Sequence, residues 1–403
     1  MSTGAGAVSL LGDIDGVGRD GVRGGYSRHV FEPAELDLRE WFTEQAARRG
    51  LEVETDANGN LWAWWGQPGP DALVTGSHLD SVPGGGAFDG PLGVVSALAA
   101  VDLLRARGVA PSKPIAVVVF AEEEGGRFGV PCLGSRLLTG AIDADRARAL
   151  TDADGTTLAE AAASAGLDPA RLGADPAVLG RIGQFVELHV EQGRGLIHQD
   201  APVALGSTVI AHGRWRFSFS GQGNHAGATL LADRRDPMLP AAAVVGAARR
   251  VAAAWPDARA TVGRLVPKPG GTNVIASSVD LWLDARVPGS GKTPAMVTEI
   301  AEAARHAAEQ EGCSVTVTEE SCSDDVVFDA GLRAEFDNVL GGVPALPTGA
   351  GHDAAILAAH VPTAMLYVRN PTGISHAPEE FAEPADVERG AAALADVLEN
   401  SAI

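Results

Sequence analysis

The chain is poor in cysteine and in positive charge. Its 403 residues include 3 cysteines at irregular spacing, which excludes a disulfide framework and predicts reduced thiols. Lysine and arginine number 31 against 52 aspartates and glutamates, so the formal net charge is -21. Nucleic acids and anionic membrane surfaces are bound through basic patches. We therefore expect neither of them as a partner.

The sequence also lacks a long apolar run. No apolar stretch reaches the roughly 20 residues that cross a bilayer. Residues 1–12 have neither the basic region nor the apolar region of a signal peptide. These absences predict a cytoplasmic protein. With 45% hydrophobic and 21% charged residues, the chain is neither disordered nor fibrous, and its length predicts two domains.

Metal-binding side chains follow the first clear strand candidate. The apolar run at residues 72–75 ends at Gly76, and His78 and Asp80 come directly after it, with Asp89 in the glycine-rich segment that follows. Open α/β sheets bind ligands at the carboxyl ends of their strands. This sheet edge is therefore a candidate site.

Three adjacent glutamates follow a second strand candidate at residues 114–120. On a solvated loop Glu122, Glu123 and Glu124 would be harmless, and that is the usual setting of such a run. Directly after a buried strand, their repulsion raises a carboxyl pKa unless a cation neutralises the charge. A metal ion supplies that compensation.

Two histidines complete the pattern. A third strand candidate, residues 185–193, carries His189, and a loop rich in glycine and proline after the run 362–368 carries His376. Taken alone, each histidine is typical of an ordinary surface or core position. Together with the acidic segments, both become candidate metal ligands.

These segments resemble the dinuclear metal amidohydrolases, a group that includes aminoacylases, bacterial dipeptidases and carboxypeptidase-G-like enzymes. The branch of N-carbamoyl-L-amino acid hydrolases, β-ureidopropionases and allantoate amidohydrolases is more similar. Its motifs occur here as Gly-Ser-His-Leu-Asp-Ser-Val, Gly-Gly-Ala-Phe-Asp-Gly-Pro-Leu-Gly-Val, Glu-Glu-Gly-Gly-Arg-Phe, Glu-Leu-His-Val-Glu-Gln-Gly and Gly-Ile-Ser-His-Ala-Pro-Glu. The resemblance covers about residues 30–398.

The resemblance implies two divalent metal ions bridged by one carboxylate. Zinc is the expected metal, with manganese, cobalt and nickel as alternatives. The implied ligands are His78, Asp89, Glu124, His189 and His376. Asp89 would bridge, with His78 and His189 in one site and Glu124 and His376 in the other. Because no cysteine is required, we expect Cys132 to be a buried structural thiol rather than a nucleophile.

The resemblance also implies the roles of two further carboxylates. Glu123 matches the general base that deprotonates the water between the ions, and Asp80 matches the carboxylate that orients His78. The hydroxide would attack the ureido carbonyl, and Glu123 would return its proton to the leaving nitrogen. The products from a carbamoyl group are ammonia and carbon dioxide.

Alternating helices and strands predict the α/β class, with a mixed-sheet α/β/α catalytic domain. Helices are expected at residues 33–49 and 91–107 and, as peripheral elements, between 155 and 182. From about residue 209, the order strand, helix, strand, strand, helix, strand predicts an inserted α+β sandwich with one sheet face covered by two helices. The expected domains are 1–208 with 325–403, and 209–324. The resemblance implies that the insertion serves as lid and makes a homodimer.

Four residues match substrate-binding positions of the similar enzymes. His225, in a Gly-x-x-x-His-Ala-Gly segment, would reach the partner subunit's active site and polarise the scissile carbonyl. Asn273 and Arg286 would hold the substrate carboxylate in their own subunit, and Gln192 would add a contact beside His189. A simple turn histidine, and a surface pair of Arg286 with Asp284, are the alternatives.

The expected reaction is hydrolysis of a carbamoyl or ureido group on a small carboxylate, either an N-carbamoyl-L-amino acid or allantoate. An aminoacylase or dipeptidase is the alternative within the enzyme class. An inactive dimeric binding protein would require the loss of a ligand or the base, and none is lost. One departure affects the pocket wall: residues 228–231 are Ala-Thr-Leu-Leu where similar enzymes often have Thr-Thr-Pro-Met.

Overall fold

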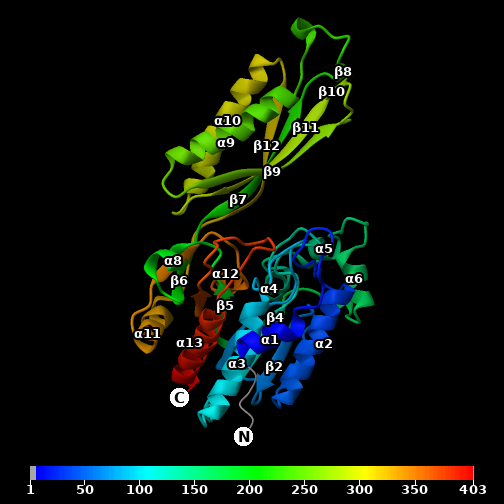
Figure 1. The fold of residues 1–403 in the computed structure, drawn as a ribbon. Helices are drawn as coiled ribbons and strands as arrows, with labels where there is room; N and C mark the ends of the chain where they lie inside the picture. The colour runs from blue at the N-terminus through cyan, green and yellow to red at the C-terminus, as the bar shows by residue number, and fades with distance from the viewer. Residues whose placement is uncertain (1–5, 403) are drawn as a thin grey trace. The chain divides into compact units, whose positions relative to one another are not determined.

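The computed structural model describes residues 6–402 and divides the chain into two compact units (Figure 1). Unit 1 is Met1–Thr208 with Val327–Ile403, and unit 2 is Val209–Val326. The second boundary therefore follows residue 326, two residues beyond the expected end of the insertion at 324.

Unit 1 contains a nine-stranded mixed sheet in the order β1-β2-β4-β3-β5-β15-β6-β13, with β14 paired to β6. Its four central strands, β4, β3, β5 and β15, are parallel neighbours. The strands are β1 (Glu52–Thr55), β2 (Leu61–Trp65), β3 (Ala72–His78), β4 (Ile115–Phe120), β5 (Ile182–Val190), β6 (Val203–Val209), β13 (Val326–Val327), β14 (Ala345–Thr348) and β15 (Thr363–Val368).

The central strands are buried along almost their whole length because helices cover the sheet. Every residue of β3, β4 and β15 is buried, as expected for parallel strands enclosed on both faces. Helix α3 packs on β3 and β5, and against α13. The helices of unit 1 are α1 (Ala7–Ile14), α2 (Pro33–Arg48), α3 (Pro91–Ala106), α4 (Leu133–Thr139), α5 (Ala144–Arg148), α6 (Leu158–Ser164), α7 (Pro176–Leu179), α8 (Gly195–Gln199), α11 (Ala330–Leu340), α12 (Asp353–Leu357) and α13 (Pro384–Ala402).

The predicted α/β class is confirmed, and two strand ends differ from the expectation. Strand β3 continues through His78, beyond the apolar run 72–75, and β5 starts at Ile182 and ends at Val190. In both strands polar side chains lie inside the ladder, where apolar patterning cannot mark the strand end.

Unit 2 is a four-stranded antiparallel sheet in the order β12-β7-β11-β9, with helices α9 and α10. Strand β11 alternates buried and half-buried residues along its length, which is the pattern of a sheet with one covered face. The elements are β7 (His212–Ser220), α9 (Met238–Ala254), β9 (Arg259–Lys268), β11 (Ser278–Arg286), α10 (Lys292–Gln310) and β12 (Ser314–Ser323). They occur in the order that the sequence predicts.

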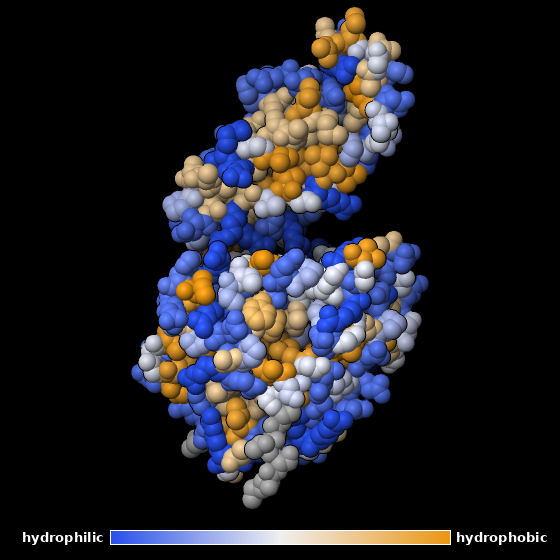
Figure 2. Space-filling model, viewed as in Figure 1, coloured by the Kyte–Doolittle hydropathy of each residue, from blue (hydrophilic) through white to orange (hydrophobic). Residues whose placement is uncertain are grey.

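The surface of unit 2 carries an apolar area. Apolar side chains gather on the visible face of unit 2 around α9 (Figure 2), which carries the exposed Leu239 and Val245.

No helix within residues 6–402 is long and apolar enough to cross a bilayer. Cys132 is buried, as predicted, whereas Cys322 is exposed.

Candidate metal centre

The candidate ligands of unit 1 gather because three parallel strands present their carboxyl ends at one sheet edge. His78 is the last residue of β3, opposite Phe120 at the end of β4, and Glu123 and Glu124 follow that strand. His189 lies near the end of the neighbouring β5. Strand pairing therefore brings together residues that are more than a hundred positions apart.

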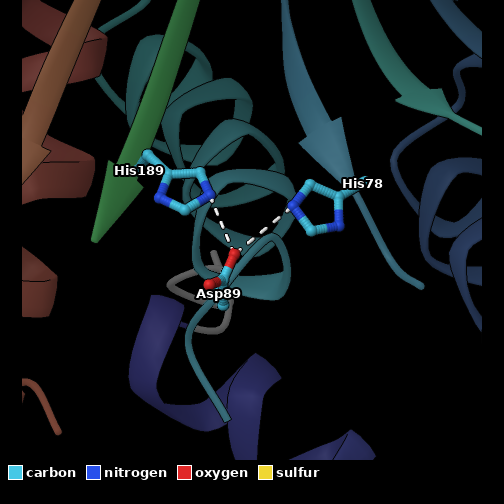
Figure 3. Close-up of side chains that lie close together, drawn as sticks. All are labelled: His78, Asp89 and His189. Carbon is cyan, nitrogen blue, oxygen red and sulfur yellow. Dashed lines mark ion pairs between the residues drawn. The ribbon is translucent and has the colours of Figure 1, made fainter. Parts of the chain in front are cut away.

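A first group is built around one oxygen of Asp89. His189 Nε2 lies 3.2 Å and His78 Nε2 lies 3.6 Å from Asp89 Oδ1. Figure 3 shows both rings directed at this carboxylate from two different strands. All three side chains are buried. Their nitrogen and oxygen atoms are close enough to hold one metal ion.

A second group uses the other oxygen of Asp89. His376 Nε2 lies 3.4 Å from Asp89 Oδ2 and 3.2 Å from Glu124 Oε2. His376 adopts a left-handed backbone conformation, with φ of 57°, in the loop after β15. The two groups therefore share Asp89, with one carboxylate oxygen in each.

The histidine tautomers fit a metal ion better than a hydrogen-bonded cluster. His78 Nδ1 lies 3.0 Å from the backbone oxygen of Asp80, and His189 Nδ1 lies 3.0 Å from that of Val190. Donation from Nδ1 leaves each neutral ring with a lone pair on Nε2. Within residues 6–402 neither buried Nε2 atom has a hydrogen-bond partner. A lone pair that faces a carboxylate needs a cation between them, and imidazole with carboxylate suits a divalent metal.

Asp80 lies beside this group, and its carboxylate contacts residues other than His78. Its carboxylate accepts the backbone N–H groups of Glu123 at 3.1 Å and Glu124 at 3.0 Å. The expected contact with His78 Nδ1 is longer, 3.6 Å, and the backbone oxygen of Asp80 is nearer to that nitrogen. Burial raises the Asp80 pKa to about 6. The Asp80 carboxylate therefore holds the glutamate segment, and its backbone oxygen is the atom nearest to the His78 ring.

Glu123 lies at the edge of the first group. Its Oε2 is 3.6 Å from His78 Nε2, and its Oε1 accepts a hydrogen bond from the Cys132 thiol at 3.3 Å. Burial raises the Glu123 pKa well above its usual value, although the neighbouring His78 opposes the shift. The thiol contact was not predicted, because Cys132 approaches Glu123 only through the turn that leads into α4.

The charges of the cluster shift the pKa of Asp89 and His376 in opposite directions. Burial acts to raise the Asp89 pKa, but the neighbouring imidazoles of His189, His376 and His78 hold it well below its usual value. Hydrogen bonds to Asp89 and Glu124 raise the His376 pKa to about 11. The cluster is therefore strongly attractive to cations.

Several buried polar residues behind the ligands were missed from the sequence. The His352 ring lies 4.6 Å from the His189 ring. Asp353 accepts the Ser135 hydroxyl at 2.5 Å, and Glu187 accepts the Ser77 hydroxyl at 2.8 Å. A sequence signal was present: His352 and Asp353 come shortly after strand β14, as Asp80 does after β3, and Glu187 interrupts an apolar strand.

Gln192, predicted as a substrate contact, lies near the candidate ligands. Its Nε2 donates to Asp89 Oδ2 at 2.8 Å and to Ser375 Oγ at 3.1 Å. Ser375 also contacts Asp89, and neither it nor its neighbour Glu380 was predicted as a site residue. In this structure Gln192 therefore contacts a ligand carboxylate.

The candidates of unit 2 are not gathered into one group: His225 and Asn273 are exposed and Arg286 is half-buried. His225, in β8 (Asn224–His225), pairs with Val274 of β10 (Val274–Ile275), and the Asn273 backbone oxygen accepts the N–H of Ala226 at 2.9 Å. Both ladder strands lie at one end of the unit 2 sheet (Figure 1). His225 and Asn273 are therefore close neighbours.

Arg286 lies at the opposite end of β11 and has a partner of its own. Asp284 binds its guanidinium through two hydrogen bonds, at 2.7 and 3.0 Å, which is the pairing considered as the alternative. The nine residues of β11 span about 26 Å at 3.3 Å per residue. This arrangement argues against the predicted grouping of Asn273 with Arg286, because within one chain Asn273 lies with His225.

Comparisons with known proteins agree with the site. Residues 74–400 match the peptidase family M20/M25/M40. An N-carbamoyl-L-amino acid amidohydrolase of Geobacillus stearothermophilus is 38% identical over 381 residues, 92% of each chain. The allantoate amidohydrolase of Escherichia coli is 29% identical, covering 93% of this chain and 92% of that one. The solved structure of a hydantoinase/carbamoylase family amidase from Burkholderia vietnamiensis is 28% identical with a TM-score of 0.90, covering 100% and 99% of the chains. The chain belongs to the peptidase family M20/M25/M40.

Proposed function

We propose that the protein hydrolyses the C–N bond of a carbamoyl or ureido group on a small carboxylate substrate, such as an N-carbamoyl-L-amino acid or allantoate. The observation that carries the proposal is the pair of ligand groups sharing Asp89, with Glu123 beside them. Relatives named for these two activities match this chain over nearly its whole length. The reaction releases ammonia, carbon dioxide and the free amine.

The residues present fit two divalent ions, and zinc is the first choice. His78 and His189 would hold one ion and Glu124 and His376 the other, with Asp89 shared. When bound, such ions neutralise the clustered carboxylates and make water a stronger acid. The backbone contacts of His78 and His189 orient both rings toward the shared carboxylate.

Glu123 is the residue that we assign to proton transfer. Its carboxylate lies beside the ligand atoms and is buried. A carboxyl with a raised pKa holds a proton readily, so it can take one from water and deliver it to the leaving nitrogen. The two backbone hydrogen bonds to Asp80 fix the segment that carries Glu123 and Glu124.

Substrate binding is assigned to unit 2. The Arg286 guanidinium suits a substrate carboxylate, and on an acidic protein such a cation counters the repulsion of an anion. We infer a homodimer in which His225 reaches the partner's metal centre and polarises the carbonyl. Because Asn273 lies beside His225, we assign Asn273 to the partner's active site as well. The exposed Leu239 and Val245 on α9 support an association surface on unit 2.

The test is an ammonia-release assay with zinc-reconstituted protein. N-carbamoyl-L-amino acids and allantoate should release ammonia, whereas N-acyl amino acids and dipeptides should not be cleaved. The Glu123→Gln variant controls for contaminating hydrolases. Cleavage of N-acyl amino acids or dipeptides alone, detected as free amino groups without ammonia, would replace the proposal with an aminoacylase or dipeptidase.

A further inference from the structure

We propose that Glu380 is a positioning residue for the metal centre, which joins the loop of Asp89 to the loop of His376 before any metal binds. The inference rests on the proposed metal site and adds a residue to which no role has been assigned. Glu380 follows His376 by four positions and lies almost 300 residues from Asp89. It belongs to none of the side-chain groups within residues 6–402 that could hold a metal ion.

The Glu380 carboxylate accepts hydrogen bonds from both loops. Its Oε1 accepts the backbone N–H groups of Phe88 and Asp89, each at 2.9 Å. Its Oε2 accepts the Ser375 hydroxyl at 3.1 Å. The side chain is 4% exposed. A buried carboxylate is costly unless donors surround it, and three donors meet this one.

The number of hydrogens on each donor determines which group donates to which in this network. Gln192 Nε2 has two hydrogens, and its two contacts are Asp89 Oδ2 and Ser375 Oγ. Ser375 has a single hydrogen and faces both Asp89 Oδ2, at 3.0 Å, and Glu380 Oε2. If Asp89 Oδ2 serves as a ligand, the hydroxyl hydrogen is left for Glu380. The chain of donors then runs from Gln192 through Ser375 to Glu380.

Packing around Glu380 keeps its carboxylate in this position. A Cβ atom at Gly86 would lie 2.2 Å from Glu380 Oε1, so only glycine lets the metal-binding loop approach. The flanking residues Phe88 and Phe381 meet edge to face, with their ring centroids 6.1 Å apart. Aromatic contact and hydrogen bonds therefore hold the same two loops together.

Loss of Glu380 should affect metal affinity more than the catalytic step itself. Asp89 is the shared carboxylate and His376 belongs to the second group, so both must be placed correctly for two ions to bind. Loss of a residue that orients metal ligands typically weakens metal binding about 10- to 100-fold. We expect an effect of this size when Glu380 no longer reaches the amides of Phe88 and Asp89.

The experiment compares four proteins that differ at one of two adjacent glutamates: wild type, Glu380→Ala, Glu380→Asp and the control Glu379→Ala. Glu379 is exposed and carries the same charge, so its loss tests for general electrostatics. Zinc affinity is measured by competition with a chromophoric chelator. Hydrogen exchange of the amides of Phe88 and Asp89 is measured in the metal-free proteins by mass spectrometry.

Glu380→Ala should bind zinc about 10- to 100-fold more weakly, and the two amides should exchange faster. Glu380→Asp keeps the charge but is one methylene too short, so it should show the same two changes even if the alanine variant folds poorly. Glu379→Ala should match wild type. Affinity within about twofold of wild type in Glu380→Asp, with unchanged exchange, would overturn the inference. Because neither readout uses a substrate, failure of the proposed hydrolysis would leave this result intact.

Discussion

The candidate residues of unit 1 converge and are mostly buried, with His376 half exposed, whereas those of unit 2 are exposed or half-buried and lie at two ends of a sheet. In unit 1, Asp89 has three imidazole nitrogens within 3.2 to 3.6 Å. In unit 2, β11 separates Arg286 from His225 and Asn273. Unit 1 therefore brings a set of candidate metal ligands together by itself. The proposed substrate residues of unit 2 would need another surface to act together.

Strand direction explains the contrast. Parallel strands in unit 1 bring several carboxyl ends to one edge, so ligands from distant segments meet there. The antiparallel strands of unit 2 send successive strand ends to opposite edges. Residues at the two ends of β11 cannot both touch one small molecule from the same chain.

The largest effect is expected from removal of the metal ions that unit 1 would hold. A chelator should remove about two ions per chain with all turnover, because the ions would activate the water that attacks the substrate. Metal analysis and activity are measured on the same sample, and zinc should restore both. Full turnover of metal-free protein would contradict this.

Glu123→Gln should lower kcat about 10²- to 10⁴-fold, because the amide keeps the shape but cannot accept the proton. Metal content should stay at the wild-type level. Glu379→Gln, at an exposed position, is the matched control and should retain full activity. A decrease of less than about tenfold would remove Glu123 from proton transfer.

His225→Ala should lower kcat about 10²- to 10³-fold, as expected for loss of one donor to a developing oxyanion. Mixing this variant with Glu123→Gln under conditions of subunit exchange tests whether His225 acts in the site of the other subunit. A heterodimer would contain one site with both defects and one with neither, so about half of its sites should recover. Confirmed exchange without recovered activity would place His225 in its own subunit's site.

A second mixture, of His225→Ala with Asn273→Ala, sharpens the grouping of the unit 2 residues. If both residues come from the same neighbouring subunit, each site of the heterodimer lacks one of them and no activity returns. If Asn273 serves its own subunit instead, half of the sites recover. Recovery would therefore restore the grouping of Asn273 with Arg286.

The smallest effect is expected at Arg286. Asp284→Asn removes its charged partner, and such pairs contribute roughly 0.2–1 kcal/mol, so KM should fall by up to about fivefold with kcat unchanged. Asp280→Asn is the matched control, because Asp280 lies on β11 with Asp284 and pairs with Lys268 of β9. A KM that rises in Asp284→Asn would mean that Asp284 positions Arg286 for the substrate.

The sequence by itself predicted the α/β class, the order of the unit 2 elements and the residues that meet around Asp89. Each of these depends on a short local pattern: an apolar run, a change of period, or a polar residue just after a strand. A segment such as residues 72–89 carries its strand and three of its polar site residues together. Local patterning therefore pointed to this sheet edge, and the resemblance to the dinuclear metal amidohydrolases supplied the full set of candidate ligands.

Only the tertiary structure decided which side chains support that cluster. Glu380 meets the amides of Phe88 and Asp89 across almost 300 residues, and Cys132 meets Glu123 through a turn. Strand register, not residue type, placed Asn273 beside His225 and far from Arg286. These contacts depend on how segments distant in sequence pack and on side chains that are common in any protein, so no local pattern marks them.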